Sequence, residues 1–223
     1  MGQIKEKLMS LKPEESYRIK TGLCRLKSAF SLNEFDYGCV KTFEHRIELN
    51  DPNPVKQICR RFPMHIKDKI QEHIKKLLEA DIIEPNQSPW ASNFVLTKKK
   101  DGSFRICSVF RPLNDRTIKN TSPLPRIDDT LDSLREAKYY NSLDLFAGFH
   151  QVPVRECDRI KTAFITPHGV FQFKKMPWGL YNAPSTFQEM MNNIMREYIG
   201  KFCMVYVDDD IVYSKSLGEH LTL

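Results

Sequence analysis

The sequence predicts an α+β fold in which helices back a mainly antiparallel sheet. Three observations predict this class. One segment carries apolar residues at helical spacing, several short apolar runs alternate with turn residues, and the last two apolar runs flank an acidic tripeptide. With 41% hydrophobic residues in 223, the chain can bury a substantial core, which argues against a disordered or fibrous protein.

Charge and cysteine content narrow the class of protein further. The formal net charge is +6 and the pI about 8.9, an excess that is compatible with a polyanionic partner but too modest to indicate one. The six cysteines include no Cys-x-x-Cys pair, which disfavours a zinc ribbon or a dithiol redox site. No apolar run suits a signal peptide or a bilayer span. We therefore expect a soluble cytoplasmic protein with reduced thiols and no membrane partner.

The first part of the chain predicts an arm followed by a helix. Residues 1–60 show no strong period and are expected to form an irregular N-terminal arm, with one domain over 61–223. Apolar residues recur every three or four positions over 66–78, which predicts an amphipathic helix. Pro85 and Pro89 are expected to stop it.

From residue 93 the pattern favours strands. Asp101-Gly102 lies between the apolar runs 94–96 and 104–107 and predicts a hairpin. A second helix is expected over 127–136. Further strands are expected over 139–145, 162–166, 170–173, 202–207 and 211–213. Pro184 should open a third helix whose inner face is formed by Phe187, Met190, Met191 and Ile194.

The acidic tripeptide Asp208-Asp209-Asp210 is the most informative local feature. Hairpin tips usually contain Asn-Gly or Asp-Gly, because residues there adopt positive φ. Carboxylates gathered at a tip repel one another, and a divalent cation such as Mg²⁺ would offset that repulsion. A solvated acidic turn explains this segment equally well when it is considered alone.

A third carboxylate favours the metal interpretation. Asp144 ends an apolar strand, just before Ala147-Gly148. If that strand neighbours the hairpin of Asp208, the cluster would suit two metal ions about 4 Å apart, which assist in-line phosphoryl displacement. Taken alone, Asp144 is better explained as a strand-end turn residue or a helix cap.

Longer blocks of the sequence, in a fixed order, point to a family. They are Asn-Ser-Leu-Asp-Leu-Phe-Ala-Gly-Phe-His-Gln (141–151), Lys-Thr-Ala-Phe (161–164), Met-Pro-Trp-Gly-Leu-Tyr-Asn-Ala-Pro (176–184) and Tyr-Val-Asp-Asp (206–209). Upstream, the segments 79–84, 88–92 and 98–102 resemble the fingers of the same family. Together, from about residue 40 to the last residue, they resemble gypsy-type LTR retrotransposon (retrovirus-like) Pol reverse transcriptases.

The resemblance implies the fingers and palm of a right-hand polymerase. Its activity would be RNA-directed DNA synthesis, in which a dNTP is transferred to a primer 3′-hydroxyl on an RNA or DNA template. Two Mg²⁺ ions, for which Mn²⁺ may substitute, would serve as cofactors. Asp144, Asp208 and Asp209 would be the catalytic and metal-binding carboxylates, and the Leu145 carbonyl would assist one metal.

The same resemblance implies a nucleotide pocket. Lys99 and Arg105 would meet the incoming triphosphate, roles that suit a mobile point charge and a bidentate guanidinium. Phe149 would lie under the sugar and exclude a 2′-hydroxyl, and Gln151 and Trp178 would line the pocket.

Structural explanations compete with several of these roles. The lysines at 98–100 could be a solvated hairpin tip, and Phe149 and Trp178 could be core aromatics. His150 is expected to be a hydrogen-bonded core histidine without a chemical role.

The sequence departs from the family pattern at several positions. Asp210 stands where an aliphatic residue usually follows the two aspartates, so a carboxylate enters an apolar strand at a cost in stability. Val109 stands where an Asp usually precedes Arg111. The chain reaches Leu223 without a thumb or ribonuclease H domain, which remaining Pol domains or a second subunit would have to supply. The resemblance also implies a location in the cytoplasm, which would include virus-like particles.

Two other functions compete with the polymerase. A degenerate or co-opted remnant would keep the fold and bind nucleic acid or protein without catalysis, and Asp210 and Val109 favour it. An unrelated two-metal nuclease could share the carboxylates, but it would not need a sugar-selecting Phe149 or the lysines of the fingers.

Overall fold

The computed structural model describes residues 13–26, 30–31, 37–98, 104–120 and 134–223. Its helices are α2 (Pro13–Arg25), α3 (Met64–Glu79), α4 (Arg111–Asn114), α6 (Glu156–Arg159), α7 (Ala183–Ile194) and α8 (Leu217–His220), with 3-10 turns η2 (Gly148–Gln151) and η3 (Ile160–Thr162). Its strands are β1 (Ile83–Pro85), β2 (Asn93–Lys98), β3 (Phe104–Val109), β4 (Tyr139–Asp144), β5 (Phe164–Thr166), β6 (Gly169–Phe173), β7 (Cys203–Tyr206) and β8 (Asp209–Ser214).

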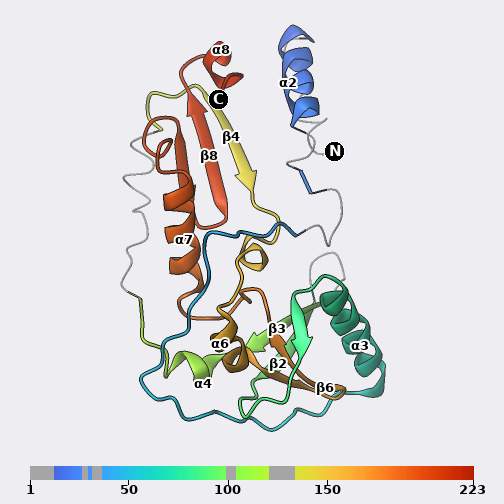
Figure 1. Cartoon of the computed structure of the whole chain (residues 1–223). Coiled ribbons are helices and arrows are strands. Elements are labelled where there is room, and N and C mark those ends of the chain that lie inside the picture. Colours follow the sequence, from blue (N-terminus) through green and yellow to red (C-terminus); the bar gives the residue numbers. More distant parts are fainter. Residues whose placement is uncertain (1–12, 27–29, 32–36, 99–103, 121–133) are drawn as a thin grey trace.

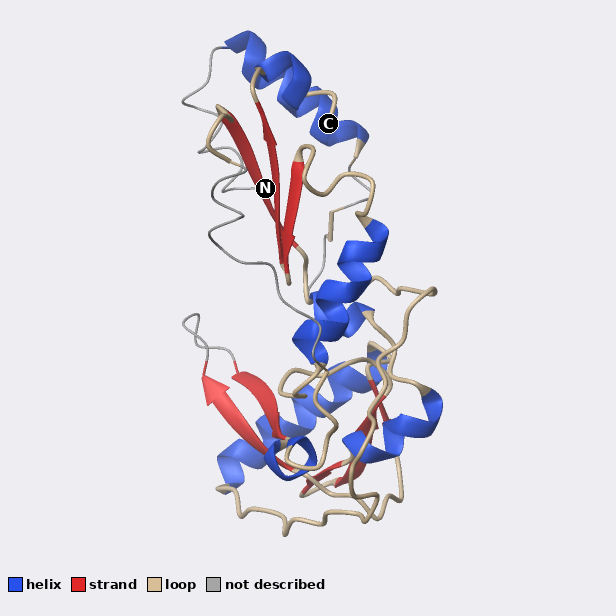
Figure 2. Cartoon of the chain, turned by 90° about the vertical axis from the view of Figure 1, so that its left-hand side faces the viewer, coloured by secondary structure: helices blue, strands red, loops and turns tan. Residues whose placement is uncertain are grey.

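The described strands form three small antiparallel sheets. Their orders are β1-β6-β5, β2-β3 and β4-β8-β7. Figure 1 shows β4 and β8 beside α7 in the upper part of the molecule, and α3 with the other two sheets in the lower part. In the view turned by 90°, the sheet β4-β8-β7 lies in the upper part of the molecule and the β2–β3 hairpin lies in the lower part (Figure 2). The α+β class predicted from the sequence is confirmed.

The helix predicted over 66–78 is α3. Ile70, Ile74 and Leu77 are buried, while the lysines and glutamates between them are exposed. The helix ends at Glu79, well before Pro85, because the chain turns sharply at Asp81, whose φ is +55°. The hairpin predicted around Asp101-Gly102 is β2–β3 in antiparallel register, although its turn, 99–103, lies outside the described residues.

The described part of the N-terminal segment includes one helix and a stretch that reaches the core. It contains α2, and part of it enters the core at the buried residue Ile47. The Ile47 N–H donates to Asp158 Oδ2 at 3.1 Å, and Lys161 Nζ donates to the Ile47 carbonyl at 2.6 Å and to Asp158 Oδ1 at 2.5 Å. The domain boundary at residue 60 stays a prediction, and these contacts cross it.

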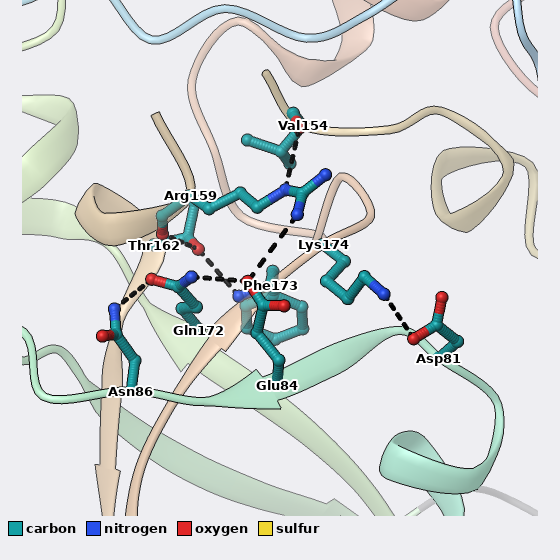
Figure 3. Close-up of polar contacts among 9 residues, drawn as sticks. All are labelled: Asp81, Glu84, Asn86, Val154, Arg159, Thr162, Gln172, Phe173 and Lys174. Carbon is teal, nitrogen blue, oxygen red and sulfur yellow. Dashed lines mark hydrogen bonds and ion pairs between the residues drawn. The ribbon is translucent and has the colours of Figure 1, made fainter. Parts of the chain in front are cut away.

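A polar network holds β1 against β6 and the neighbouring turns (Figure 3). Gln172 Nε2 donates to Glu84 Oε1 at 2.6 Å, and the Arg159 guanidinium lies 3.7 Å from the same carboxylate oxygen. The Phe173 N–H donates to Thr162 Oγ1 at 2.9 Å. These contacts fix the end of β6, from which the chain continues into Met176 and Trp178.

The third predicted helix is α7, with one correction. Phe187, Met190 and Met191 are buried as expected, but Ile194 is 53% exposed. It is the last residue of α7, and the neighbouring residues of that final turn are also exposed, so the core does not reach it.

The second predicted helix, 127–136, falls largely outside the described residues, and 134–136 form a turn. Among the described helices, none has the length and apolar character needed to cross a membrane.

Candidate active site

Two aspartates from distant parts of the chain meet across β4 and β8. In the antiparallel register Asp144 pairs with Asp209, and the Leu145 N–H donates to the Asp208 carbonyl at 3.2 Å. The predicted adjacency of Asp144 and the acidic hairpin is therefore confirmed. Residues directly opposite in such a pair have Cβ atoms about 5 Å apart, so the side chains of Asp144 and Asp209 emerge on the same face of the sheet.

The sequence suggested that the acidic tripeptide forms the turn of the hairpin, but the structure places only Asp208 in the turn. Tyr206 pairs with Asp209, which leaves Val207 and Asp208 as a two-residue connection and places Asp209 and Asp210 in β8. Val207 has a φ of +53°, which is an outlier for a β-branched residue. A two-residue hairpin with positive φ at its first position favours Gly there. Backbone strain is thus stored next to Asp208.

Gln188 of α7 holds this strained turn in place. Its side chain is 2% exposed and makes two contacts with the hairpin. Nε2 donates to the Val205 carbonyl at 3.1 Å, and Oε1 accepts from the Val207 N–H at 2.8 Å. Nothing in the sequence singles out Gln188, because a polar position among the apolar residues of a helix does not reveal a partner so far along the chain.

Gly148 lies against the carboxylate of Asp208. A Cβ at this position would lie 2.6 Å from Asp208 Oδ1 and 2.8 Å from Cζ of Phe187. Ala147, just before it, has a φ of +47°, so the chain turns tightly after β4. Only a residue without a side chain fits between the acidic hairpin and α7. The dipeptide Ala147-Gly148 was the only signal of this in the sequence.

The electrostatics of Asp208 favour a bound cation. Burial raises the pKa of its carboxyl group, and the charges of Asp144 and then Asp209 raise it further. Its Oδ1 is buried and has no hydrogen-bond partner among the described residues. An orphaned carboxylate oxygen beside two like charges suits a divalent cation, which prefers oxygen ligands. In the described parts of the chain, however, no three His, Cys, Asp or Glu side chains already converge on one point.

Asp210 points away from this cluster, into the core. It alternates with Asp209 along β8, pairs with Val205 and is only 5% exposed. Burial, followed by the charges of Asp209 and Asp208, raises its pKa to about 6. Its Oδ1 lacks a partner among the described residues. The expected stability cost of this carboxylate has a structural basis in these three observations.

Three of the predicted pocket residues lie together beyond β4. Phe149 is 7% exposed, and its ring centroid lies 5.4 Å from that of Phe187 and 6.3 Å from that of Trp178. Gln151 Nε2 donates to the Phe146 carbonyl at 3.0 Å. Phe149 thus packs as a core aromatic directly after the turn that follows Asp144. This position is compatible with a purely structural role and with a role under the sugar of a bound nucleotide.

Two further expectations concern backbone and ring contacts nearby. The Leu145 carbonyl accepts a 3.2 Å hydrogen bond from the Gly148 N–H and keeps a second lone pair for another ligand. His150 is buried, and its Nδ1 lies 3.2 Å from the Met176 carbonyl, so it is the hydrogen-bonded core histidine that was expected.

Of the two predicted triphosphate ligands, Arg105 lies on a different sheet from the carboxylates. Arg105 belongs to β3, where its backbone pairs with Thr97. Lys99 lies in the segment 99–103, outside the described residues. The structure therefore brings Asp144 and the acidic hairpin together and packs Phe149 against Trp178, while Arg105 belongs to a separate sheet.

Comparisons with known proteins agree with this geometry. Residues 97–223 match the family model described as reverse transcriptase (RNA-dependent DNA polymerase). The chain is 37% identical over 210 residues to the retrovirus-related Pol polyprotein from transposon gypsy of Drosophila melanogaster, covering 91% of the chain and 20% of that protein. It is 45% identical over 122 residues to an RNA-directed DNA polymerase homolog of Oenothera berteroana, covering 53% of the chain and 86% of that protein.

A solved structure matches nearly the whole chain. The foamy viral protease-reverse transcriptase, solved in complex with an RNA/DNA hybrid, superposes with a TM-score of 0.87 at 22% identity. The superposition covers 99% of the chain and 30% of the viral protein. At this identity the likeness establishes the fold, which is that of the fingers and palm. The chain spans about a fifth of the length of the Drosophila Pol polyproteins that it matches.

Proposed function

Because the chain belongs to the reverse transcriptase (RNA-dependent DNA polymerase) family, we propose that it carries the polymerase active site of a retrotransposon Pol polyprotein. The reaction is transfer of a deoxynucleotide from a dNTP to a primer 3′-hydroxyl. The observation that carries this proposal is the register that pairs Asp144 with Asp209 beside the buried, orphaned oxygen of Asp208.

Members of this family generally use divalent metal ions. Here Asp144, Asp208 and Asp209, with the Leu145 carbonyl, would hold two Mg²⁺ ions, and Mn²⁺ would be an alternative. When bound, such ions activate the attacking oxygen and stabilise the leaving one. The chain's own contribution is to hold Asp144 and Asp209 on one sheet face beside the turn that carries Asp208, with Gln188 fixing that turn and Gly148 leaving room for Asp208.

The residues around the turn after β4 would position the nucleotide. Phe149 is braced by Trp178 and Phe187, so its ring can act as a rigid floor that excludes a 2′-hydroxyl. Gln151 and Trp178 would line the same pocket. Arg105 and Lys99, from the fingers hairpin, would approach the triphosphate from the other sheet and neutralise its charge.

A nucleic-acid duplex is the proposed partner. The fold neighbours include foamy viral protease-reverse transcriptase solved with an RNA/DNA hybrid and with double-stranded DNA. The net charge of +6 is compatible with the same kind of partner. We extend this partner to the present chain, with an RNA or DNA template-primer as the ligand.

Primer extension tests the proposal directly. The purified chain is given an RNA template, a DNA primer, dNTPs and Mg²⁺ or Mn²⁺, beside an Asp208→Asn control whose fold is checked by circular dichroism. Metal-dependent synthesis that Asp208→Asn lacks is the expected result. Synthesis that survives in Asp208→Asn would reject the assignment of the carboxylates.

A second candidate function rests on Asp210. The Asp210 carboxylate, 5% exposed in β8 and with an unpartnered oxygen among the described residues, favours a catalytically degenerate remnant that keeps the fold and binds nucleic acid. A folded chain that binds template-primer but makes no product, even with Mn²⁺ and even after Asp210→Val, would support that function over the polymerase.

A further inference from the structure

A short N-terminal segment, Tyr37–Val40, crosses the turn that follows β4; we call it the strap. The Val40 N–H donates to the Gln151 carbonyl at 2.9 Å. The Tyr37 ring stacks on Phe146 with centroids 5.9 Å apart and meets His150 edge-on at 5.8 Å. In Figure 1 the chain in this region runs beneath the end of β4 before descending to the lower part.

The backbone of the strap also touches the side chain of Gln151. A Cβ on Gly38 would lie 2.9 Å from Gln151 Oε1, so the segment passes at contact distance. Gln151 in turn donates to the Phe146 carbonyl. The position of the strap and the position of this side chain are therefore coupled.

A cysteine and a lysine join the strap to the body of the protein. Lys175 Nζ donates to Cys39 Sγ at 2.7 Å. Cys39 is exposed, so small oxidants can reach its sulfur. Lys175 is anchored from the other side, because its N–H donates to the Ile82 carbonyl at 3.3 Å and it forms an isolated bridge with Pro153. The preceding residue, Lys174, pairs with Asp81 (Figure 3).

We propose that Cys39 and Lys175 form an oxidisable thiol–amine pair that covalently fastens the strap when the protein meets a peroxide. The Cys39 thiolate attacks hydrogen peroxide, the O–O bond breaks, and the sulfur becomes a sulfenic acid while water leaves. The neutral Lys175 amine then attacks that sulfur. An S–N bond forms, the S–O bond breaks, and a second water leaves, which gives a sulfenamide.

The balance of this sequence is one thiol, one amine and one peroxide giving one sulfenamide and two waters. The thiol sulfur is oxidised by two electrons, and the peroxide accepts them. A thiol reductant in excess reverses the link, because it returns two electrons and leaves as its own disulfide. Formation of the link between Cys39 and Lys175 therefore needs no reactant other than the peroxide.

Two other exposed cysteines provide internal comparisons. Cys24 and Cys157 are solvent-accessible, and within the described residues neither sulfur accepts a hydrogen bond from a lysine amine. The other three cysteines are less exposed: Cys59 and Cys107 are partly buried, and Cys203 is buried. Burial, followed by the charge of Asp210, raises the pKa of Cys203. The link should therefore form at Cys39 and not at the other exposed thiols.

Peptide mass spectrometry tests the proposal without using polymerase activity, so its result is independent of the proposed function. The folded chain is treated with hydrogen peroxide at mildly alkaline pH, free thiols are blocked, and the protein is digested. We expect a linked pair of peptides containing Cys39 and Lys175, lighter than their sum by two hydrogen atoms. Dithiothreitol should abolish it.

Two variants serve as controls. Cys39→Ser and Lys175→Arg should both lose the linked pair, and the arginine keeps the positive charge beside the sulfur. The proposal is overturned if Cys39 is converted to sulfinic or sulfonic acid without a link, or if Cys24 and Cys157 link to lysines to the same extent. A link from Cys39 that survives in Lys175→Arg would overturn it equally.

Discussion

At the scale of single residues, Gly148 is the position where both the acidic hairpin and α7 need the absence of a side chain. The acidic hairpin and α7 both approach its Cα, since a Cβ would meet Asp208 Oδ1 at 2.6 Å and Phe187 at 2.8 Å. We expect Gly148→Ala to destabilise the fold by about 1–3 kcal/mol, because neither the hairpin nor the helix can move away cheaply. Displacement of Asp208 should also lower primer extension at least about tenfold.

The control for this change is Gly218→Ala. A Cβ there meets nothing within 4 Å, so stability and synthesis should stay near wild type. Chemical denaturation and single-turnover extension of both variants provide the comparison. Equal behaviour of the two alanine variants would show that Asp208 does not depend on the space at Gly148.

Replacement of Asp210 should stabilise the fold, whereas Gly148→Ala should destabilise it. Asp210→Val should raise the free energy of unfolding at pH 7 by about 1–3 kcal/mol, because it removes an unpartnered carboxylate from a buried strand position. The pKa of Asp210 is raised from 3.8 to about 6, so the carboxylate destabilises the fold above that pH and not when protonated. The gain should therefore shrink as the pH falls from 6 towards 4.

Urea denaturation across this pH range measures the gain. Asp210→Asn separates charge from shape, since it removes the charge and keeps the size, and it should give part of the stabilisation. A loss of stability in Asp210→Val at pH 7 would mean that the carboxylate makes a favourable contact after all.

At the scale of elements, α7 controls the hairpin through one side chain. Gln188→Leu removes the contacts to the Val205 carbonyl and the Val207 N–H while filling a similar volume. We expect a loss of about 1–3 kcal/mol, because two backbone groups become unsatisfied. Extension should fall more than nucleic-acid binding does, since the affected turn carries Asp208.

Asn193→Ala, on the exposed side of α7, is the matched control and should change neither property. Binding measured by fluorescence anisotropy and extension measured on the same preparation would separate the two effects. If Gln188→Leu lowers both in proportion, the residue supports the fold as a whole and has no specific effect on the turn.

The segment that carries Ile47 gives a pH prediction. His45 is 1% exposed, and its Nδ1 lies 2.9 Å from Thr186 Oγ1 on α7. Burial lowers its pKa from 6.5 to about 4, against a smaller opposing effect of Asp158. The unfolded chain therefore takes up this proton first as the pH falls. The stability that depends on neutral His45 is present above pH 6.5 and is lost between 6.5 and 4.

The size of that loss is about 3 kcal/mol by linkage. His45→Gln cannot titrate and should show a flatter decline in stability over the same range. His168→Gln, at an exposed position, should follow wild type. Denaturant midpoints at pH 7.5, 6 and 4.5 provide the measurement, and identical slopes for wild type and His45→Gln would contradict the assignment.

The elements themselves show what the sequence could and could not reveal. The helix α3, the β2–β3 hairpin and the strands β4 and β7 follow from local periodicity and turn residues, and they appear where they were predicted. The last strand also appears, but β8 begins at Asp209, two residues before the predicted range 211–213. The sequence also allowed Asp144 and the acidic hairpin to be neighbours, because both lie at the ends of apolar strands that could pair in one sheet. Their catalytic role stays a prediction, as do the roles of Arg105 and Lys99.

What the sequence hid depends on contacts between distant segments. Val207 is a good strand residue, and its positive φ arises from the two-residue connection that the register enforces. Ile194 fitted the apolar period of α7 but lies past the edge of the core. Neither outcome is determined by neighbours in the sequence, so pattern reasoning could not find them.

At the scale of the whole molecule, metal binding should stabilise the fold. Burial raises the pKa of Asp208, and the negative charges of Asp144 and Asp209 raise it further, so the three carboxylates repel one another when they are ionised. A cation that binds only the folded state adds about 2.7 kcal/mol when its concentration is a hundredfold above its Kd. We expect Mn²⁺ or Mg²⁺ to raise Tm and a chelator to reverse the rise.

Asp208→Asn should lose most of this increase, and NaCl at matched ionic strength controls for screening of surface charge. Differential scanning fluorimetry of both proteins is sufficient. An equal rise in Tm for wild type and Asp208→Asn would place the stabilising ions elsewhere on the surface.

The sheet register also has a consequence for the order of folding. The β2–β3 hairpin joins neighbours in the sequence, whereas β4 must wait for β8, which is synthesised near the end of this chain. Long loops close slowly, because their entropy is lost before contacts compensate. Asp144 and Asp209 therefore cannot meet until β8 has been made, and a ribosome-bound chain stalled before β8 would already protect the amides of the β2–β3 hairpin from exchange while β4 still lacked its partner strand.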